Sequence, residues 1–517
     1  MKTKVFTFFW IIIVLIGSCS ERKETILRMP IGSMPQDYSI SVSTNSYVML
    51  IFRNIHDVLI EYENGSYINR LAESWNTPTS TQLTVKIRDN AYFSDGSPVT
   101  ANDVKESYLW MMNNPRSPFY DTIPIDSMVA RDNFIDIYCS RDISLQGGFI
   151  SLTGIMKAND LKKGEEYLNN HITTAGVYYV YFKNNERIIL KKNKYHRDFL
   201  KNKKAPDTIE LILEPSRSNQ YEMLINDEVD FIEFVDTEKY DEILASKKYQ
   251  ILEKDSNLIV YMMLNSSNHA ISNINFNPLE NYLAQNNTIK NPLHNKKVRQ
   301  AMAHAIDTQS YIDNYMAAKA YPIILPALRN SFGFPTDKPC YEFDLKLAKK
   351  LMKEAGYQNG FEINIHTANL RYNRPFADFI KECLEKINIT TNVIVLSSEE
   401  MRERDTNRAA TINAINIRSN FTLANTLSPR YIYLPNTPSG DNLFGNYNPK
   451  INELLYKITA LTPPDPDLIG LYKELTDVII DETFIIPFLN PFSIYAINKK
   501  FSYNHTPDLK FTDFYTN

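Results

Sequence analysis

Apolar and polar positions change their spacing midway through an early stretch of the chain. From Leu83 to Ile87 every second residue is apolar, which is the pattern of a half-buried strand. Residues 94–98, SDGSP, consist largely of turn formers. Thr100 stands three residues before Asp103, as in a capping box, and apolar residues then recur at helical spacing. The stretch therefore predicts a strand, a turn and a helix in succession.

The same two patterns continue along the chain and alternate in its second half. Asp344 and Gly356 stand where an N-cap and a C′ glycine would bound one helix, and Pro375 stands at the start of another. Strands are predicted at 26–33, 134–138, 208–213, 361–365, 391–396 and 484–489, and helices at 292–307, 344–356, 375–387, 449–458 and 468–479. Strands alternating with helices predict an α/β architecture.

The first residues combine two lysines with a short apolar run. Lys2 and Lys4 precede apolar residues 5–16, a run that is too short to span a bilayer comfortably and that we interpret as an export signal. The Ile-Gly-Ser-Cys sequence that ends at Cys19 resembles the bacterial lipobox. This resemblance implies that residues 1–18 are removed, that Cys19 carries lipid on its sulfur and amine, and that residues 19–25 form a tether. The expected location is the outer side of a bacterial membrane, and the alternative is an ordinary signal peptide.

The length and charge of the chain limit the classes of protein that fit. A chain of 517 residues is too long for a single core and predicts two to three domains. Lysine and arginine total 56 against 60 acidic residues, a net charge of −4, which argues against nucleic acid as a partner. The stretch from Lys191 to Lys204 is basic, and we interpret it as a solvated loop in preference to a binding patch.

The sequence lacks the familiar motifs of catalysis and metal binding. It contains no Gly-x-Ser-x-Gly elbow, His-Glu-x-x-His or Walker A run, so we expect a protein that is not an enzyme and uses no cofactor. His294 and His304 do not share a helix face, so no metal site is predicted. Three buried thiols, Cys139, Cys340 and Cys383, are the favoured state of the other cysteines, with Cys340–Cys383 as the pair if a disulfide forms.

Residues 70–108 also resemble a known family. The run LAESW, then a strand, then FSDGSPVTANDVKESY is similar to the signature of the extracellular solute-binding proteins of family 5, which serve peptide and nickel ABC importers. Residues 187–195 and 261–265 resemble strands of this family, and residues 221–230 and 292–307 resemble further segments of it. The resemblance extends from about residue 25 to the C-terminus and is strongest for the oligopeptide-binding type. It implies a type II periplasmic-binding-protein fold of the α/β class, with two lobes around a ligand cleft and an extra scaffold domain.

Three domains and a function follow from this resemblance. It assigns residues 26–56, 183–264 and 485–517 to domain I, residues 57–182 to domain II and residues 265–484 to domain III. Domains I and III would close on the ligand like a hinged clamp. The implied function is that of a monomeric, lipid-anchored binding protein that captures peptides and delivers them to ABC permease subunits in the membrane.

The resemblance also places the ligand. In this family the peptide lies between the lobes as an added β-strand, and an aspartate that follows a domain III strand pairs with its free amine. The matching segment is residues 412–423, INAINIRSNFTL, which contains no acidic residue. The candidates from this segment are Ile415, Asn416, Ile417, Arg418, Ser419 and Asn420, with Ser419 or Asn420 in the place of the aspartate. Ser33 and Met34 are candidates for main-chain contacts, and Phe119, Tyr120 and Tyr261 are candidates for the pocket walls.

The missing aspartate leaves several alternatives open. A buried ammonium group without an opposite charge costs roughly 3–5 kcal/mol. Either the ligand has no free amine at this place, or another acid pairs with the amine, or the segment aligns a few residues away. Arg418 would favour an anionic ligand, and the alternative is that it is a solvent-exposed charge on the strand. The alternative functions are a binding protein for a specialised solute such as a nickel or haem complex, and a surface adhesin or sensor that has kept the fold.

Overall fold

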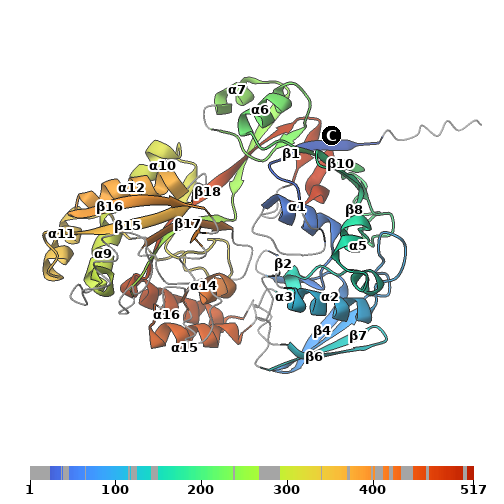
Figure 1. Cartoon of the computed structure of the whole chain (residues 1–517), viewed down its shortest axis with the longest axis horizontal. Coiled ribbons are helices and arrows are strands. Elements are labelled where there is room, and N and C mark those ends of the chain that lie inside the picture. Colours follow the sequence, from blue (N-terminus) through green and yellow to red (C-terminus); the bar gives the residue numbers. More distant parts are fainter. Residues whose placement is uncertain are drawn as a thin grey trace, which may run out of the picture.

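The computed structural model places the chain in two halves. It describes residues 24–35, 38, 46–63, 66–114, 117, 125–140, 149–236, 239–266, 291–338, 341–368, 373–397, 400–401, 412–418, 423–431, 446–461, 465–504 and 509–517. Figure 1 shows the described parts of 24–213 in one half and those of 291–482 in the other. The halves are joined by strands from the middle and the end of the chain.

A four-stranded sheet contains the first strand of the chain. Its order is β1 (Ile26–Ile31), β10 (Thr208–Leu213), β9 (Arg187–Lys192) and β8 (Tyr178–Lys183), with β1 parallel to β10 and the other pairs antiparallel. Its core includes residues of α1 (Ser46–Ile55), of η4 (Phe511–Asp513) and of the hairpin of β19 (Phe501–Tyr503) and β20 (Phe514–Thr516). The strands predicted at 26–33, 187–195 and 208–213 are confirmed.

A second four-stranded sheet lies in the same half, beside the hairpin of β2 (Ile60–Glu63) and β3 (Ser66–Asn69). Its order is β4 (Ala72–Thr79), β5 (Gln82–Ile87), β7 (Phe134–Cys139) and β6 (Ile125–Arg131). The predicted strand, turn and helix are confirmed as β5, a turn with Gly96 at φ 84°, and α2 (Ala101–Asn113). The backbone N–H of Thr100 donates to Asp103 Oδ2 at 2.8 Å, and the Asp103 N–H donates to Thr100 Oγ1 at 3.2 Å, so the capping box is formed. The short helices α3 (Phe149–Leu152), α4 (Ala158–Leu161) and α5 (Glu165–Asn170) follow.

The largest sheet has eight strands and extends into both halves. Its path is β11 (Phe231–Ile232), β18 (Ile485–Asn498), β13 (Leu258–Leu264), β17 (Ile412–Arg418), β15 (Phe361–Ala368) and β16 (Ile389–Leu396), while β12 (Tyr249–Asp255) and β14 (Ala320–Pro322) also pair with β18. Helices α6 (Arg217–Ile225) and α7 (Tyr240–Ala245) contribute to a small core beside β12. The strand predicted at 484–489 is confirmed but continues to Asn498.

Strand β18 changes its partner midway. Leu489 is the last residue of β18 in register with β13, where it lies opposite Val260. Phe492 is the first in register with β12, where it lies opposite Asp255. The chain therefore passes from one half of the molecule to the other at two adjacent places, residues 256–257 and residues 490–491.

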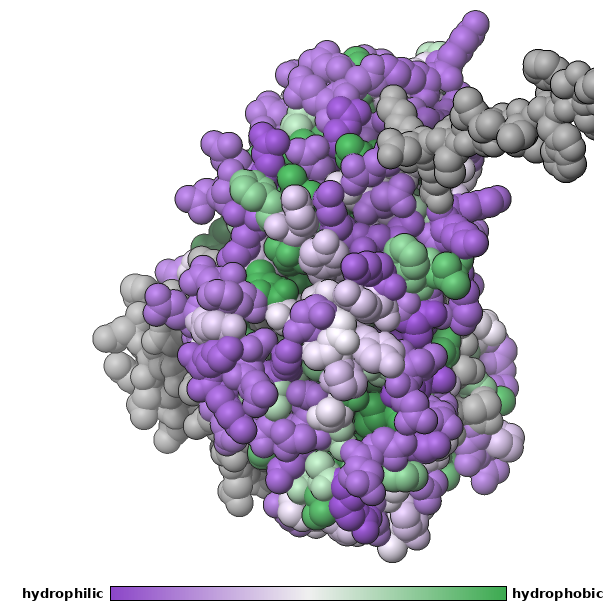
Figure 2. Space-filling view, turned by 90° about the vertical axis from the view of Figure 1, so that its right-hand side faces the viewer, coloured by the Kyte–Doolittle hydropathy of each residue, from purple (hydrophilic) through white to green (hydrophobic). Residues whose placement is uncertain are grey.

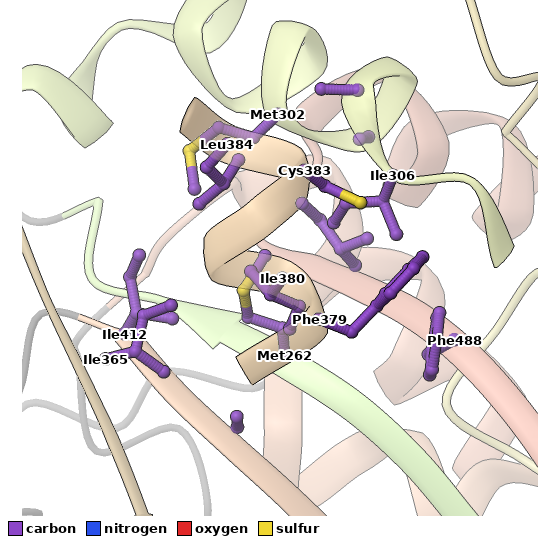
Figure 3. Packing of buried hydrophobic residues seen from close by; sticks show 14 of the residues in the cluster. Met262, Met302, Ile306, Ile365, Phe379, Ile380, Cys383, Leu384, Ile412 and Phe488 are labelled. Atoms are coloured by element: carbon purple, nitrogen blue, oxygen red, sulfur yellow. The ribbon is translucent and has the colours of Figure 1, made fainter. Parts of the chain in front are cut away.

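Helices cover both faces of the large sheet. One core is formed with α9 (Lys296–Ala305), α10 (Thr308–Tyr315), α11 (Leu345–Glu354) and α12 (Asn373–Glu385). Figure 3 shows Phe379, Ile380, Cys383 and Leu384 of α12 in this core, together with Met262, Ile365, Ile412 and Phe488 of the strands. Another core packs the opposite face against α14 (Leu423–Tyr431), α15 (Pro449–Thr459) and α16 (Asp467–Glu482).

The predicted helix boundaries hold with small changes. The helix predicted at 292–307 divides into a 3₁₀ turn, η3 (Pro292–His294), and α9, because the Asn295 side chain caps a new start by accepting from the Lys297 N–H at 3.0 Å. Asp344 caps α11 as predicted, and Gly356 follows its end with φ 83°. Helix α12 begins two residues before Pro375.

Two further predictions concern the cysteines and the membrane. Cys383 is a buried free thiol in the core of Figure 3, which agrees with the favoured state and not with a Cys340–Cys383 disulfide; Cys340 lies outside the described residues. Within the described part of the chain, which begins at Glu24, no helix combines the length and the apolar character needed to cross a bilayer.

Candidate ligand-binding site

Strand β17, which contains four of the candidate residues, has a different neighbour along each edge. On one edge it pairs with β13 over its whole length, from Ile412 opposite Leu264 to Arg418 opposite Leu258. On the other edge it pairs with β15 at only three residues, from Ile412 to Ala414. In the part of the chain that the structure describes, no strand pairs with this second edge beyond Ala414. Among the described residues, residues 415–418 therefore have no strand partner on this second edge, and we call them the free edge of β17.

The direction of the backbone groups on this free edge follows from the last paired residue. Thr367 of β15 donates its hydroxyl to the Ala414 carbonyl at 3.0 Å, so the Ala414 carbonyl points towards β15. The N–H and C=O of one strand residue point to the same side, and the side alternates from residue to residue. The backbone groups of Asn416 and Arg418 therefore point to the free edge, whereas those of Ile415 and Ile417 point to β13. An extended ligand could pair there by main-chain hydrogen bonds.

A buried asparagine cross-links the two chain crossings next to this edge. Asn490 of β18 is 3% exposed, and its Nδ2 donates to the carbonyl oxygens of Leu258 at 2.6 Å and of Ser256 at 3.0 Å. The Ser256 hydroxyl in turn donates to the Pro491 carbonyl at 2.5 Å. Because Leu258 lies opposite Arg418, this network fixes the end of β13 that supports the free edge.

We expect Asn490→Leu to lower the free energy of unfolding by about 1–3 kcal/mol, because two partly buried carbonyl groups lose their donor. Urea unfolding at neutral pH measures this change. Asn314→Leu, on the exposed surface of α10, is the matched control and should change stability by no more than about 0.5 kcal/mol. Equal stability of the two variants would contradict the role assigned to Asn490.

A row of buried polar side chains lies on the face of the sheet that carries Ile415. Asn364 and His366 of β15 are 3% and 0% exposed, and Asn413 of β17, opposite His366, is 2% exposed. The alternation of Phe361, Ile363 and Ile365 identified only the other face as buried. The sequence contains only a weak indication that this face is also buried, namely that positions 364, 366 and 368 carry no lysine, arginine, aspartate or glutamate.

The structure brings together only some of the candidate residues. Tyr261 of β13 lies opposite Ile415 and is fully buried, whereas Ser33 and Met34 follow β1 in the other half of the molecule and are half-buried. Asn416, Ile417 and Arg418 are described as strand backbone only. Phe119, Tyr120, Ser419 and Asn420 lie outside the described residues. The roles of all these residues in binding remain predictions.

The buried charges that lie away from the free edge include two internally paired groups, around Arg299 and around Asp57. Arg299 of α9 donates to the carbonyl of Glu482 at 2.8 Å and to its carboxylate at 3.1 Å. Burial lowers the pKa of Arg299 to about 10, against the opposing effect of the Glu482 charge.

Residues 24–35 and the later described ranges contain no group of three or more His, Cys, Asp or Glu side chains placed to hold a metal ion.

The second group of buried charges is centred on Asp57, which follows α1. Arg197 pairs with Asp57 Oδ2, and His196 Nε2 lies 3.6 Å from the same oxygen. The Val58 N–H donates to Asp57 Oδ1 at 3.0 Å. Burial alone would raise the pKa of Asp57, but the charge of Arg197 and the hydrogen bonds from His196 and Arg197 outweigh it and hold that pKa well below its usual range.

Comparisons with known proteins identify relatives over most of the chain. The family model described as bacterial extracellular solute-binding proteins, family 5 middle, matches residues 66–440. Heme-binding protein A of Haemophilus influenzae is 22% identical over 73% of this chain and 70% of its own length. The nickel-binding protein NikA of Staphylococcus aureus is 21% identical over 71% of this chain and 68% of its own length. The fold matches that of the periplasmic binding protein DppA of Helicobacter pylori in complex with the peptide STSA, with a TM-score of 0.75, 19% identity and coverage of 95% and 98% of the two chains.

Proposed function

The chain belongs to the bacterial extracellular solute-binding proteins of family 5, and from this premise we propose that it captures a peptide between its two halves and delivers it to an ABC permease. The proposal includes the three domains at the boundaries given above and an anchor of lipid on Cys19. The fold supports it, because the structure has the mixed α/β architecture of the binding proteins in this family. The related proteins are named for binding haem, nickel or peptide, so the choice of peptide needs support from the site itself.

The observation that carries the choice of peptide is the free edge of β17. Asn416 and Arg418 direct their main-chain groups away from β13, at a place where β15 no longer pairs. A peptide can satisfy these groups whatever its side chains are, whereas a haem or nickel complex offers no strand to pair with them. The buried polar row of Asn364, His366 and Asn413 begins beside this edge and would supply polar groups at its inner end.

The absence of an acidic residue in segment 412–423 limits which end groups the proposed peptide can carry. With serine or asparagine in the place of the aspartate, an ammonium group would lie there without an opposite charge. Arg418 adds a positive charge to the same segment, and guanidinium binds carboxylate in a bidentate manner. We therefore propose a ligand without a free amine at this end, such as a peptide that binds in the reverse direction or has a blocked N-terminus.

A substitution at the free edge tests the mode of binding. We expect Asn416→Pro to weaken peptide binding about 10- to 100-fold, because it removes one donor and leaves an acceptor of the ligand unpaired, a loss of about 1–3 kcal/mol. Isothermal titration calorimetry with a peptide identified as described below measures the change.

Asn416→Ala, which keeps the backbone donor, is the control and should bind within a fewfold of the natural chain. The strand itself should tolerate proline, because the N–H of residue 416 does not pair with β13. Equal affinity of the proline and alanine variants would contradict main-chain binding at this edge.

The ligand class can be read from the purified protein. We propose native mass spectrometry of residues 20–517, prepared without unfolding. A set of peptide masses released on denaturation would support a peptide carrier, and one defined mass, or haem or nickel, would support the specialised solute. A protein that carries nothing and is not stabilised by a peptide library would support the adhesin or sensor alternative.

A further inference from the structure

The loop between β9 and β10 gathers positive charge on an acidic protein. Residues 191–204, KKNKYHRDFLKNKK, contain seven lysine or arginine residues and one aspartate, whereas the whole chain has a net charge of −4. Lys194, Lys203 and Lys204 are exposed in the structure. Leu200 is 69% exposed, more than any other large apolar side chain among the residues that the structure describes. We call residues 193–206 the basic loop.

The basic loop is held in place by contacts from its own residues and from Lys192, the last residue of β9. Lys192 donates its ammonium group to the carbonyl oxygens of Asn202 at 3.1 Å and Ala205 at 2.7 Å. Arg197 and His196 reach inward to Asp57. The ring of Tyr195 lies so close to Gly96 that a Cβ there would be 3.0 Å from Tyr195 Cζ. The exposed lysines and Leu200 are therefore carried on a fixed support.

The first described residues of the chain lie directly beside this loop. The Thr25 carbonyl accepts from the N–H groups of Asp207 at 2.8 Å and Thr208 at 3.0 Å. Glu24 Oε1 lies 3.7 Å from Lys191 Nζ. Six peptide units separate Cys19 from Thr25, and an extended chain of that length spans roughly 20 Å. A lipid on Cys19, as in the proposed function, would keep the basic loop within roughly that distance of the bilayer surface.

Acidic groups of the described residues pair with four of the seven cations, because Glu24 and Asp57 also pair with Lys191 and Arg197, and the remaining positive charge includes Lys194 and Lys204. Asp198 pairs with Lys201 at 2.8 Å, and Asp207 pairs with Lys192 at 3.2 Å. No acid of the described residues forms an ion pair with Lys194 or Lys204. Figure 2 shows the side that faces right in Figure 1, and it is mainly hydrophilic with small hydrophobic areas. The described residues on this side therefore offer no broad apolar surface for attachment, so electrostatic attraction would supply most of the binding free energy.

We propose that the basic loop, which the sequence alone favoured as a solvated loop, is a second membrane contact, which binds anionic phospholipid headgroups and inserts Leu200 at the interface. Clusters of several lysines next to a membrane anchor bind anionic lipid in this way, and the attraction falls off within a Debye length. Lysine stems can lie along the interface while their ammonium groups reach the headgroups. The contact would orient the anchored protein, with the loop side of β9 and β10 against the bilayer. The proposal rests on the proposed lipid anchor for its geometry, but its test does not use the anchor.

The test uses the lipid-free mature chain, residues 20–517, with sedimentation of vesicles at physiological salt. We expect binding to vesicles of 30% phosphatidylglycerol in phosphatidylcholine and none to pure phosphatidylcholine. Replacing Lys194, Lys203 and Lys204 together by glutamine should weaken binding by roughly 100-fold, since each lysine near the surface contributes about a factor of five. The matched control replaces Lys346, Lys349 and Lys353 of α11, three exposed lysines in the other half, by glutamine and should bind like the natural chain.

Each other outcome would overturn the proposal. Equal losses in the two triple variants would mean that overall charge drives the binding, and equal binding to neutral vesicles would mean that headgroup charge plays no part. Duplex DNA bound as tightly as the anionic vesicles, and released by the same triple substitution, would indicate an unspecific polyanion site. Thermal unfolding of both variants confirms that they are folded. Whether Cys19 carries lipid is measured separately by metabolic labelling. An error in the proposed lipid anchor can therefore be told apart from an error in the proposed membrane contact.

Discussion

Cys19→Ala is expected to remove all covalent lipid from the protein. The proposed lipid is attached through the sulfur and the amine of Cys19, and alanine offers no sulfur for the first attachment. The effect should be complete, because no other residue of the segment before Glu24 is a cysteine. Metabolic labelling with palmitate and the intact mass of the purified chain both measure it. Several acyl chains form a firm membrane anchor, whereas a single chain gives only reversible binding, so the substitution removes a firm anchor.

Cys383→Ala provides the control for this experiment. Cys383 of α12 is buried in the core, far from the site of lipid attachment in sequence, so the Cys383→Ala variant should remain fully labelled. Label that persists in Cys19→Ala, or a natural chain that is never labelled, would instead identify residues 1–18 as an ordinary signal peptide. Lipid has to be measured directly, by label and by mass, and not by membrane association. An uncleaved signal segment could hold the variant at the membrane without lipid.

Asp57→Asn should have the largest effect on stability. The Arg197 side chain is only 10% exposed, and the substitution leaves its charge buried without a partner. Breaking a buried pair from one side costs about 3–5 kcal/mol. Urea unfolding of the natural chain and the variant at pH 7 measures the loss. Asp95→Asn is the control, because Asp95 pairs with Lys157 at the surface and its loss should be much smaller.

The pH dependence of the same pair has a definite sign. The pKa of Asp57 is lower in the folded protein than in the unfolded chain, so its contribution is fully present above the unfolded value of about 3.9. The contribution is lost as the pH falls below that value towards the folded pKa. The stability difference between the natural chain and Asp57→Asn should therefore be constant from pH 7 to about pH 5 and shrink below about pH 4. A difference that already shrank well above pH 4 would contradict the assignment to Asp57.

The sequence predicted those elements whose signals are local. In residues 70–108 the alternation of β5, the SDGSP turn and the Thr100–Asp103 capping box all lie within a few residues of one another, and the structure contains each of them. The predicted end of β18, at residue 489, was wrong for a physical reason. Asn490-Pro491 looks like the end of a strand, but β13 has stopped pairing and β12 has not yet begun there, so neither strand needs the N–H that proline lacks.

The candidate site depended on contacts between distant segments, which periodicity cannot supply. The resemblance identified the segment of β17, but its free edge follows from how few residues β15 pairs with it. The burial of His366 and Asn413 likewise depends on the pairing of distant segments, because the two residues lie opposite each other on adjacent strands. Local spacing could identify Ile363 and Ile365 as buried, but it could not show that both faces of β15 are covered.

The position of β18 near the end of the chain sets the order in which the molecule can fold. Strands β11, β12, β13 and β14 all pair with β18, yet they leave the ribosome long before residues 485–498 do. Until then these strands lack their common neighbour, and the sheet that joins the halves cannot assemble. Pairings across such long sequence separations form slowly. The sheet of β4, β5, β7 and β6 can form early, whereas the core of the β1 sheet, which includes the hairpin of β19 and β20, and the joined two-lobed body are complete only when the last 33 residues have been made.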